Sequence, residues 1–150
     1  MSDQIIEKIL IPTNGSEYAN KAVKHALWLA SASGAEIIAL NVIDTSSLVA
    51  LPEEHIRVQT LKLLKEEGNK ALIKISDLLE TEGDNQKKIK LTTLIKEGSP
   101  TDVIVKTVEE ESIGLITIGT SGKQGINRFV LGSLAENVVK AVSCPVLVVH

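Results

Sequence analysis

Short apolar runs alternate along this chain with longer segments in which hydrophobic residues recur every three or four positions. Five of the short runs are bounded by turn residues, which is typical of buried β-strands. They cover residues 8–13, 37–43, 89–95, 114–118 and 144–149. The run at 89–95 alternates imperfectly between apolar and polar residues, which indicates a partly exposed edge strand. The pattern therefore predicts a five-stranded sheet.

Helical spacing marks the segments between these strands. Ser16 is a good N-cap for the first helix, in which small apolar residues recur until Gly34 stops it. An aperiodic loop at 45–54 precedes the second helix, which we expect at 54–80. Gly68 lies inside that helix at some cost in helix propensity, and it indicates a bend.

The last two helices have clear start signals. Ser99 followed by Pro100 supplies a cap and a proline at the first helical position of the third helix. Ser133 and Glu136 form a capping box, which predicts that the fourth helix begins directly behind Gly132.

Strands and helices thus alternate through the sequence, without an internal repeat or a linker. This order predicts one domain over residues 1–150, with a three-layer α/β/α fold around a parallel five-stranded sheet. Hydrophobic residues make up 43% of the chain but aromatic residues only 2%. The core must therefore consist of Ile, Leu, Val and Ala, which suits strands covered on both faces.

Composition narrows the function classes. The net charge of −3 gives no basic footprint for nucleic acid, and three aromatic residues leave no stacking platform for bases. Cys144 is the only cysteine, so neither an intrachain disulfide nor a thiolate metal cluster can form, and we expect it to fill core space. Without signal-peptide features or an apolar run of membrane length, a cytoplasmic protein with no membrane contact is expected.

A glycine pattern follows the strand at 114–118. Gly119 and Gly122 are spaced G-x-x-G, and Gly132-Ser133 follows after nine further residues. The pattern predicts flexible backbone and the unpaired N–H groups of a helix N-terminus at the carboxyl end of a central strand. In open α/β sheets, an anionic ligand such as a phosphate binds there.

Two interpretations of this pattern remain open. Lys123 and Arg128 lie in the loop between the glycines and could offset the charge of a phosphate. Alternatively, the glycines only shape turns and both basic side chains are solvated. The hydroxyl of Ser133 could likewise contact a phosphate oxygen or cap its own helix.

Signals for catalysis are weak. His25, His55 and His150 do not fall at predicted strand ends, so we expect them on the surface. Ser121 and Ser133 have no obvious base beside them. The sequence therefore favours a binding protein over an enzyme of rapid turnover.

Four segments of the chain combine into a known pattern. They are Pro12-Thr13-Asn14-Gly15-Ser16-Glu17, Asn41-Val42, Gly119-x2-Gly122-x9-Gly132-Ser133 and Cys144-Pro145-Val146-Leu147-Val148-Val149. Together they resemble the universal stress protein family, over essentially the whole chain, and in that family the long glycine motif marks the members that bind ATP. The resemblance implies a doubly wound, Rossmann-like sheet of order 3-2-1-4-5, similar to that of adenine nucleotide alpha hydrolases. Strands one and four would then end side by side at one crevice.

The resemblance also implies which residues bind ATP. They are Pro12, Thr13, Asn14, Val42, Ile118, Gly119, Ser121, Gly122, Gly132, Ser133 and Leu134. Pro12 and Thr13 would flank the adenine. Val42 and Ile118 would contact it through apolar side chains or backbone hydrogen bonds.

At the other end of the ligand, Gly119, Ser121 and Gly122 would lie along the ribose and phosphates, and the helix start at 132–134 would present its amides to the phosphate tail. Asn14 departs from the family, which usually has an aspartate there. Asparagine can bond a ribose hydroxyl or orient a metal-bound water, but it lacks the charge that attracts Mg²⁺. ATP is therefore the expected cofactor, and Mg²⁺ is a doubtful addition to it.

The family further implies a homodimer formed through the last strand, whose apolar residues 146–149 would otherwise be an exposed edge. The expected function is a nucleotide-dependent switch or sensor in the stress response. Two alternatives remain open. One is a dimeric interaction scaffold whose pocket is empty or holds AMP, and the other is a slow ATP hydrolase that uses a metal-bound water.

Overall fold

The computed structural model describes residues 5–13, 17–82, 88–120 and 132–150. Its strands are β1 (Lys8–Pro12), β2 (Glu36–Asp44), β3 (Leu91–Gly98), β4 (Leu115–Gly119) and β5 (Val146–Val149). They form one sheet of order β3-β2-β1-β4-β5, and each neighbouring pair in it is parallel. The predicted doubly wound fold and its strand order are confirmed.

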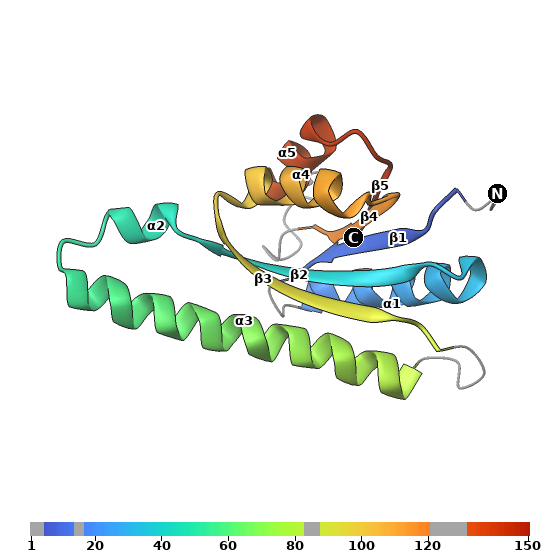
Figure 1. Cartoon of the computed structure of the whole chain (residues 1–150), viewed down its shortest axis with the longest axis horizontal. Helices are drawn as coiled ribbons and strands as arrows, with labels where there is room; N and C mark the ends of the chain where they lie inside the picture. The colour runs from blue at the N-terminus through green and yellow to red at the C-terminus, as the bar shows by residue number, and fades with distance from the viewer. Residues whose placement is uncertain (1–4, 14–16, 83–87, 121–131) are drawn as a thin grey trace.

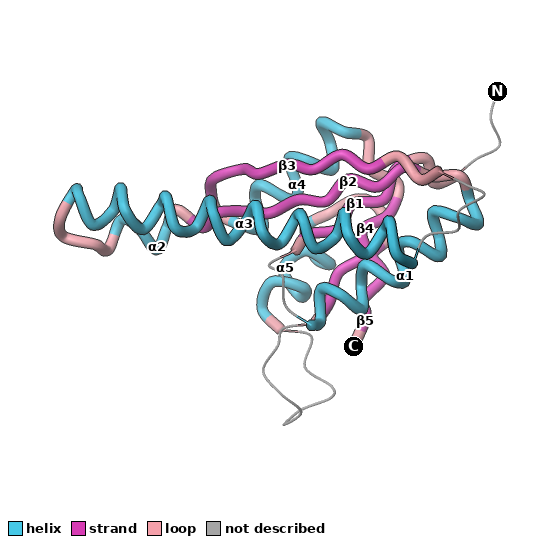
Figure 2. The backbone as a smooth tube through the Cα atoms, turned by 90° about the horizontal axis from the view of Figure 1, so that it is seen from below, coloured by secondary structure: helices cyan, strands magenta, loops and turns pink. Residues whose placement is uncertain are grey.

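The helices form the outer two layers. They are α1 (Glu17–Ser33), α2 (Ser46–Val49), α3 (Glu54–Glu82), α4 (Pro100–Glu111) and α5 (Ser133–Ala141). Helices α1 and α3 cover one face of the sheet, and α4 and α5 cover the other (Figure 1). Helix α2 and the first turns of α3 extend beyond the end of the sheet, as the view from below also shows (Figure 2).

The sheet separates two apolar clusters, and β1 contributes to both. Ile9 and Ile11 belong to the cluster under α1 and α3, whereas Leu10 belongs to the one under α4 and α5. All three side chains are fully buried. The apolar run at the start of the sequence therefore forms the centre of the molecule, as its lack of alternation predicts.

The structure differs from the sequence prediction where the local signal is short or irregular. The loop predicted at 45–54 contains α2, whose four residues are too few to show a helical period. Strand β3 begins two residues later than predicted and continues to Gly98. Strand β5 begins at Val146 rather than at Cys144, because the intervening Pro145 has no N–H to donate to a ladder.

The buried face of α3 gives a matched test of this packing. Ile75 is 1% exposed and Ile73, on the same helix, is 58% exposed. We predict that Ile75→Ala lowers the free energy of unfolding by about 2–5 kcal/mol, because it removes contacts and leaves a cavity. Ile73→Ala should change it by less than about 0.5 kcal/mol. Urea denaturation of both variants measures the difference, and equal effects would contradict the assigned orientation of α3.

Candidate functional site

The direction of the chain reverses between β1 and β4. From β1 the chain moves outward through β2 and β3, and it then returns to the other side of β1 through β4 and β5. The helix that follows β1 covers one face, and the helix that follows β4 covers the other. In such a sheet the two connections diverge at the carboxyl ends of these two strands and leave a crevice between them.

The strand register places the predicted residues of β1 and β4 at the same level of this crevice. Leu10 pairs with Ile116, so three residues further on Thr13 lies level with Gly119. Pro12 is buried as the last residue of the β1 ladder. The topology thus places the described ends of the two predicted segments, Thr13 and Gly119, on neighbouring strands of the sheet.

Strand β2 forms a wall beside the crevice, because it is longer than β1. Pairing of β1 with β2 ends at Pro12 and Leu40, whereas β2 continues to Asp44 with β3 as its only strand partner among the described residues. Val42 lies on this extension, half-buried against the cluster under α4 and α5. Its position next to the end of β1 is consistent with the apolar contact expected of it.

Thr13 is held to β2 by both of its backbone polar groups. Its N–H donates to the carbonyl of Leu40 at 2.9 Å. Its carbonyl accepts a hydrogen bond from the side-chain Nδ2 of Asn41, also at 2.9 Å. The backbone that leaves β1 is therefore fixed where it enters the crevice.

On the other side of the crevice, the end of β4 is fixed by β5. Gly119 pairs with Val149, and the N–H of Thr120 donates to the carbonyl of Val149 at 3.0 Å. The side chain of Ile118 is buried in the cluster under α4 and α5.

Helix α5 begins at this same end of the sheet, because it runs back from the carboxyl end of β4 to the start of β5. Gly132 is the N-cap, with φ 81° and ψ 152°, a conformation that is essentially restricted to glycine. The first helical hydrogen bond runs from the N–H of Glu136 to the carbonyl of Gly132. Ser133 and Leu134 are exposed on the first turn.

The capping box predicted for this helix is wrong. Ser133 is the first helical residue rather than the cap, and the helix has no side-chain cap. The carboxylate of Glu136 accepts a hydrogen bond from Nζ of Lys140 at 3.0 Å instead of reaching back. The sequence predicts a cap one residue too late, because Gly132, with its positive φ, is the residue that precedes the first helical position.

The remaining candidates divide into those on the surface and those that are not described. Asn14, Ser121, Gly122, Lys123 and Arg128 lie outside the described residues. His25, His55 and His150 are exposed, as expected. Cys144 is half-buried against the cluster under α4 and α5, and burial raises the pKa of its thiol, which keeps it protonated at neutral pH.

No group of three or more His, Cys, Asp or Glu side chains lies close enough to hold a metal ion in the part of the chain that the structure describes. Within those same residues, none of the helices is both long and apolar enough to span a bilayer.

One contact at the crevice is not predicted from the sequence. The side chain of Asn41, which the sequence identifies only as part of a family pattern, donates a hydrogen bond to the carbonyl of Thr13. The available signal was a single amide residue inside the otherwise apolar run at 37–43.

The strand order defines a doubly wound α/β protein, a fold class in which ligands bind at the switch point of the sheet. The chain belongs to the universal stress protein family, whose model matches residues 6–150. It is 42% identical over 147 residues to universal stress protein MJ0531 of Methanocaldococcus jannaschii, which covers 98% of this chain and 84% of that relative.

Solved structures agree with this assignment. The structure of MJ0577, a universal stress protein of the same organism, has a TM-score of 0.79 at 34% identity and covers 97% of this chain and 96% of its own. A universal stress protein in complex with cAMP has a TM-score of 0.70 at 23% identity, with 97% of each chain covered. An Arabidopsis thaliana family protein with AMP bound has a TM-score of 0.66 at 19% identity, with 95% and 90% covered. The last two show the shared fold.

The revised start of α5 leads to a test without ligand. We predict that Ser133→Ala changes the free energy of unfolding by less than about 0.5 kcal/mol, since the hydroxyl caps nothing, whereas removal of a true cap costs about 1 kcal/mol. Gly132→Ala should lower it by about 1–3 kcal/mol, because alanine strains the backbone at this φ. Denaturant unfolding of both variants measures these changes. A larger loss of unfolding free energy in Ser133→Ala than in Gly132→Ala would show that Ser133 is the cap after all.

Proposed function

We propose that this protein binds ATP in the crevice between β1 and β4 and acts as a nucleotide-dependent switch or sensor. The observation that carries the proposal is the start of α5, where Gly132 leaves the first turn without a side-chain cap at the carboxyl edge of the sheet. Helix N-terminal amides carry partial positive charge and attract phosphate oxygens. The absence of a Cβ at Gly132 permits close approach to them.

The other end of the crevice suits a base. Under the proposal, Pro12, Thr13 and Val42, which lie at or beside the end of β1, would supply the apolar contacts and backbone polar groups that an adenine ring needs. The structures of this fold that hold cAMP and AMP make adenine nucleotides the first ligands to test. Under the proposal, Asn14, Ser121 and Gly122 complete the site.

The start of α5 would bind the phosphates, and the ends of β1 and β2 would contact the base. A bound nucleotide would therefore bridge the two halves of the sheet. Under the proposal, backbone amides and hydroxyls at this edge would orient and hold the ligand. A site of this kind reports which nucleotide is present, and a change of occupant then changes the stability of the native state.

Binding predicts stabilisation against heat. ATP at one hundred times its dissociation constant should stabilise the native state by about 2.7 kcal/mol. For a domain of this size that corresponds to a rise in Tm of about 5–10 °C. We expect Gly132→Val to abolish the rise, because the side chain strains the backbone and fills the approach to the amides.

A matched control comes from the opposite edge of the sheet. Gly34 also has positive φ, 79°, and a Cβ there would meet open space. Gly34→Val should lower the Tm through strain but keep the ATP-dependent rise. Loss of the rise in both variants, or in neither, would contradict the assigned phosphate end. No rise in the wild type at millimolar ATP would favour the interaction scaffold.

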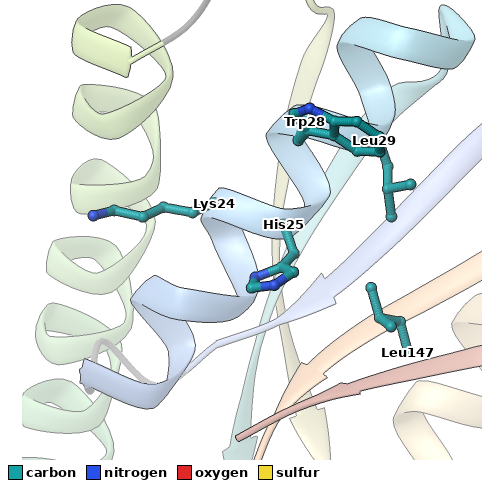
Figure 3. A pocket seen from close by; sticks show the side chains of 5 residues that line it. All are labelled: Lys24, His25, Trp28, Leu29 and Leu147. Carbon is teal, nitrogen blue, oxygen red and sulfur yellow. The ribbon is translucent and has the colours of Figure 1, made fainter.

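We also propose a homodimer through β5. In the described part of the chain, β5 pairs with β4 alone, so its other edge is open. A surface hollow of about 410 Å³ lies along it, lined by Leu147 and by four residues of α1: Lys24, His25, Trp28 and Leu29 (Figure 3). Trp28 is 70% exposed there. An apolar edge strand beside an exposed tryptophan is a surface that a second copy would cover.

The backbone of β5 offers a selective test of this dimer. The carbonyls of Pro145 and Val149 accept hydrogen bonds from β4, so by the period of two the N–H of Val148 points to the open edge. We predict that Val148→Pro yields a folded monomer, whereas Val148→Ala, which keeps the N–H, remains a dimer. Sedimentation velocity measures the mass of each. A dimeric Val148→Pro variant would exclude pairing through this edge.

A further inference from the structure

The side chain of Asn41 is the least expected polar group near the crevice. It lies on β2, is only 8% exposed, and donates from Nδ2 to the carbonyl of Thr13 at 2.9 Å. The β1–β2 ladder ends one residue earlier, at the pair of Pro12 and Leu40. The carboxamide therefore extends the bonding between these strands beyond the regular ladder.

Helix α3 packs directly on this carboxamide, and Gly68 makes the approach possible. A Cβ placed on Gly68 would lie 2.5 Å from Oδ1 of Asn41 and 3.0 Å from its Cγ. The first distance is shorter than Cβ contacts reach and the second is tight, so any larger residue at position 68 requires the carboxamide of Asn41 to shift. The next atom of Asn41, its Cβ, is 3.7 Å away, which is an ordinary contact. The glycine that the sequence analysis associated with a bend thus provides room for Asn41.

These contacts form a chain from α3 to the edge of the crevice. Gly68 limits where the carboxamide of Asn41 can lie, and the carboxamide holds the carbonyl of Thr13. Since a buried amide is expensive to leave unpaired, the side chain has one favourable orientation. Helix α3 therefore restricts the position of the Thr13 backbone indirectly, through the side chain of Asn41.

We propose that Asn41 is a positioning residue for the base of the bound nucleotide, and that Gly68 holds it in place. The inference rests on the proposed function, in which Pro12 and Thr13 flank the base. Asn41 acts through Thr13 and not on the ligand. It fixes the backbone that the base meets, and so it governs discrimination between bases, whereas the phosphates are bound independently at the start of α5.

The test compares Asn41→Ala, Gly68→Ala and the double variant. Each single variant should lower the affinity for ATP by roughly five- to tenfold, the effect of losing one hydrogen bond. In the double variant the added methyl group meets no carboxamide, so its affinity should equal that of Asn41→Ala alone. Isothermal titration calorimetry with ATP, GTP and inorganic tripolyphosphate measures all three variants and the wild type.

The ligands separate positioning from general damage to the fold. We expect the preference for ATP over GTP to fall in both single variants while the affinity for tripolyphosphate stays at the wild-type value. Equal losses for ATP and tripolyphosphate, or additive losses in the double variant, would overturn the role of Asn41. If the wild type binds ATP and Asn41→Ala binds it equally well, positioning fails and the proposed function survives. If the wild type binds no ATP, both fail.

Discussion

The burial of β1 on both faces is the constraint on which the other features depend. Three consecutive residues, Ile9, Leu10 and Ile11, are fully buried, and they point alternately to opposite sides of the sheet. A strand of this kind is stable only between two layers of helix, because its apolar side chains must leave water on both sides. Helices α1 and α5 then diverge to opposite faces from neighbouring strands. The crevice is thus a geometric consequence of covering the central strand.

The unequal lengths of β1 and β2 explain why a polar side chain is buried beside that crevice. Where β1 ends, its neighbour continues by four residues, Asn41 to Asp44, so regular pairing stops while β2 remains within reach. The backbone that leaves β1 needs partners there, because buried polar groups without hydrogen bonds are costly. Asn41 supplies one from its side chain, and glycine at position 68 lets α3 seal the same spot. Gly68 on α3 and Asn41 on β2 together thus provide the hydrogen bond and the packing that the shorter β1 leaves missing.

The sequence was sufficient for those parts of the fold that depend on local pattern. The run around Ile9 to Ile11 identified the central strand, and helical spacing identified the helices that cover it. The family resemblance indicated the strand order, and the glycine pattern indicated the edge of the sheet at which Gly119 and Gly132 lie. The turn of α2 and the shifted boundaries of β3 escaped prediction, because four residues show no period and an edge strand is under weak constraint from burial.

Local sequence pattern does not predict contacts between residues that are far apart in the chain. Gly68 reads as a weak point of a helix until β2 is known to lie against it, and Asn41 reads as a polar interruption of a strand until Thr13 is placed beside it. The start of α5 failed for a related reason. Ser133 and Glu136 match a capping box, but the positive φ of Gly132 moves the cap one residue back.

That shift has a physical consequence for the site. A serine cap would have bonded one of the first amides of α5 to its own hydroxyl and placed a side chain in front of the others. A glycine cap has no side-chain acceptor, so it stabilises the helix less than a serine bonded to one of these amides would. In the part of the chain that the structure describes, this loss falls at the start of the helix that follows β4, where under the proposal an anion would meet the uncapped amides. The helix is locally weaker there than its sequence suggests, and the same departure from the regular cap is what suits it to a phosphate.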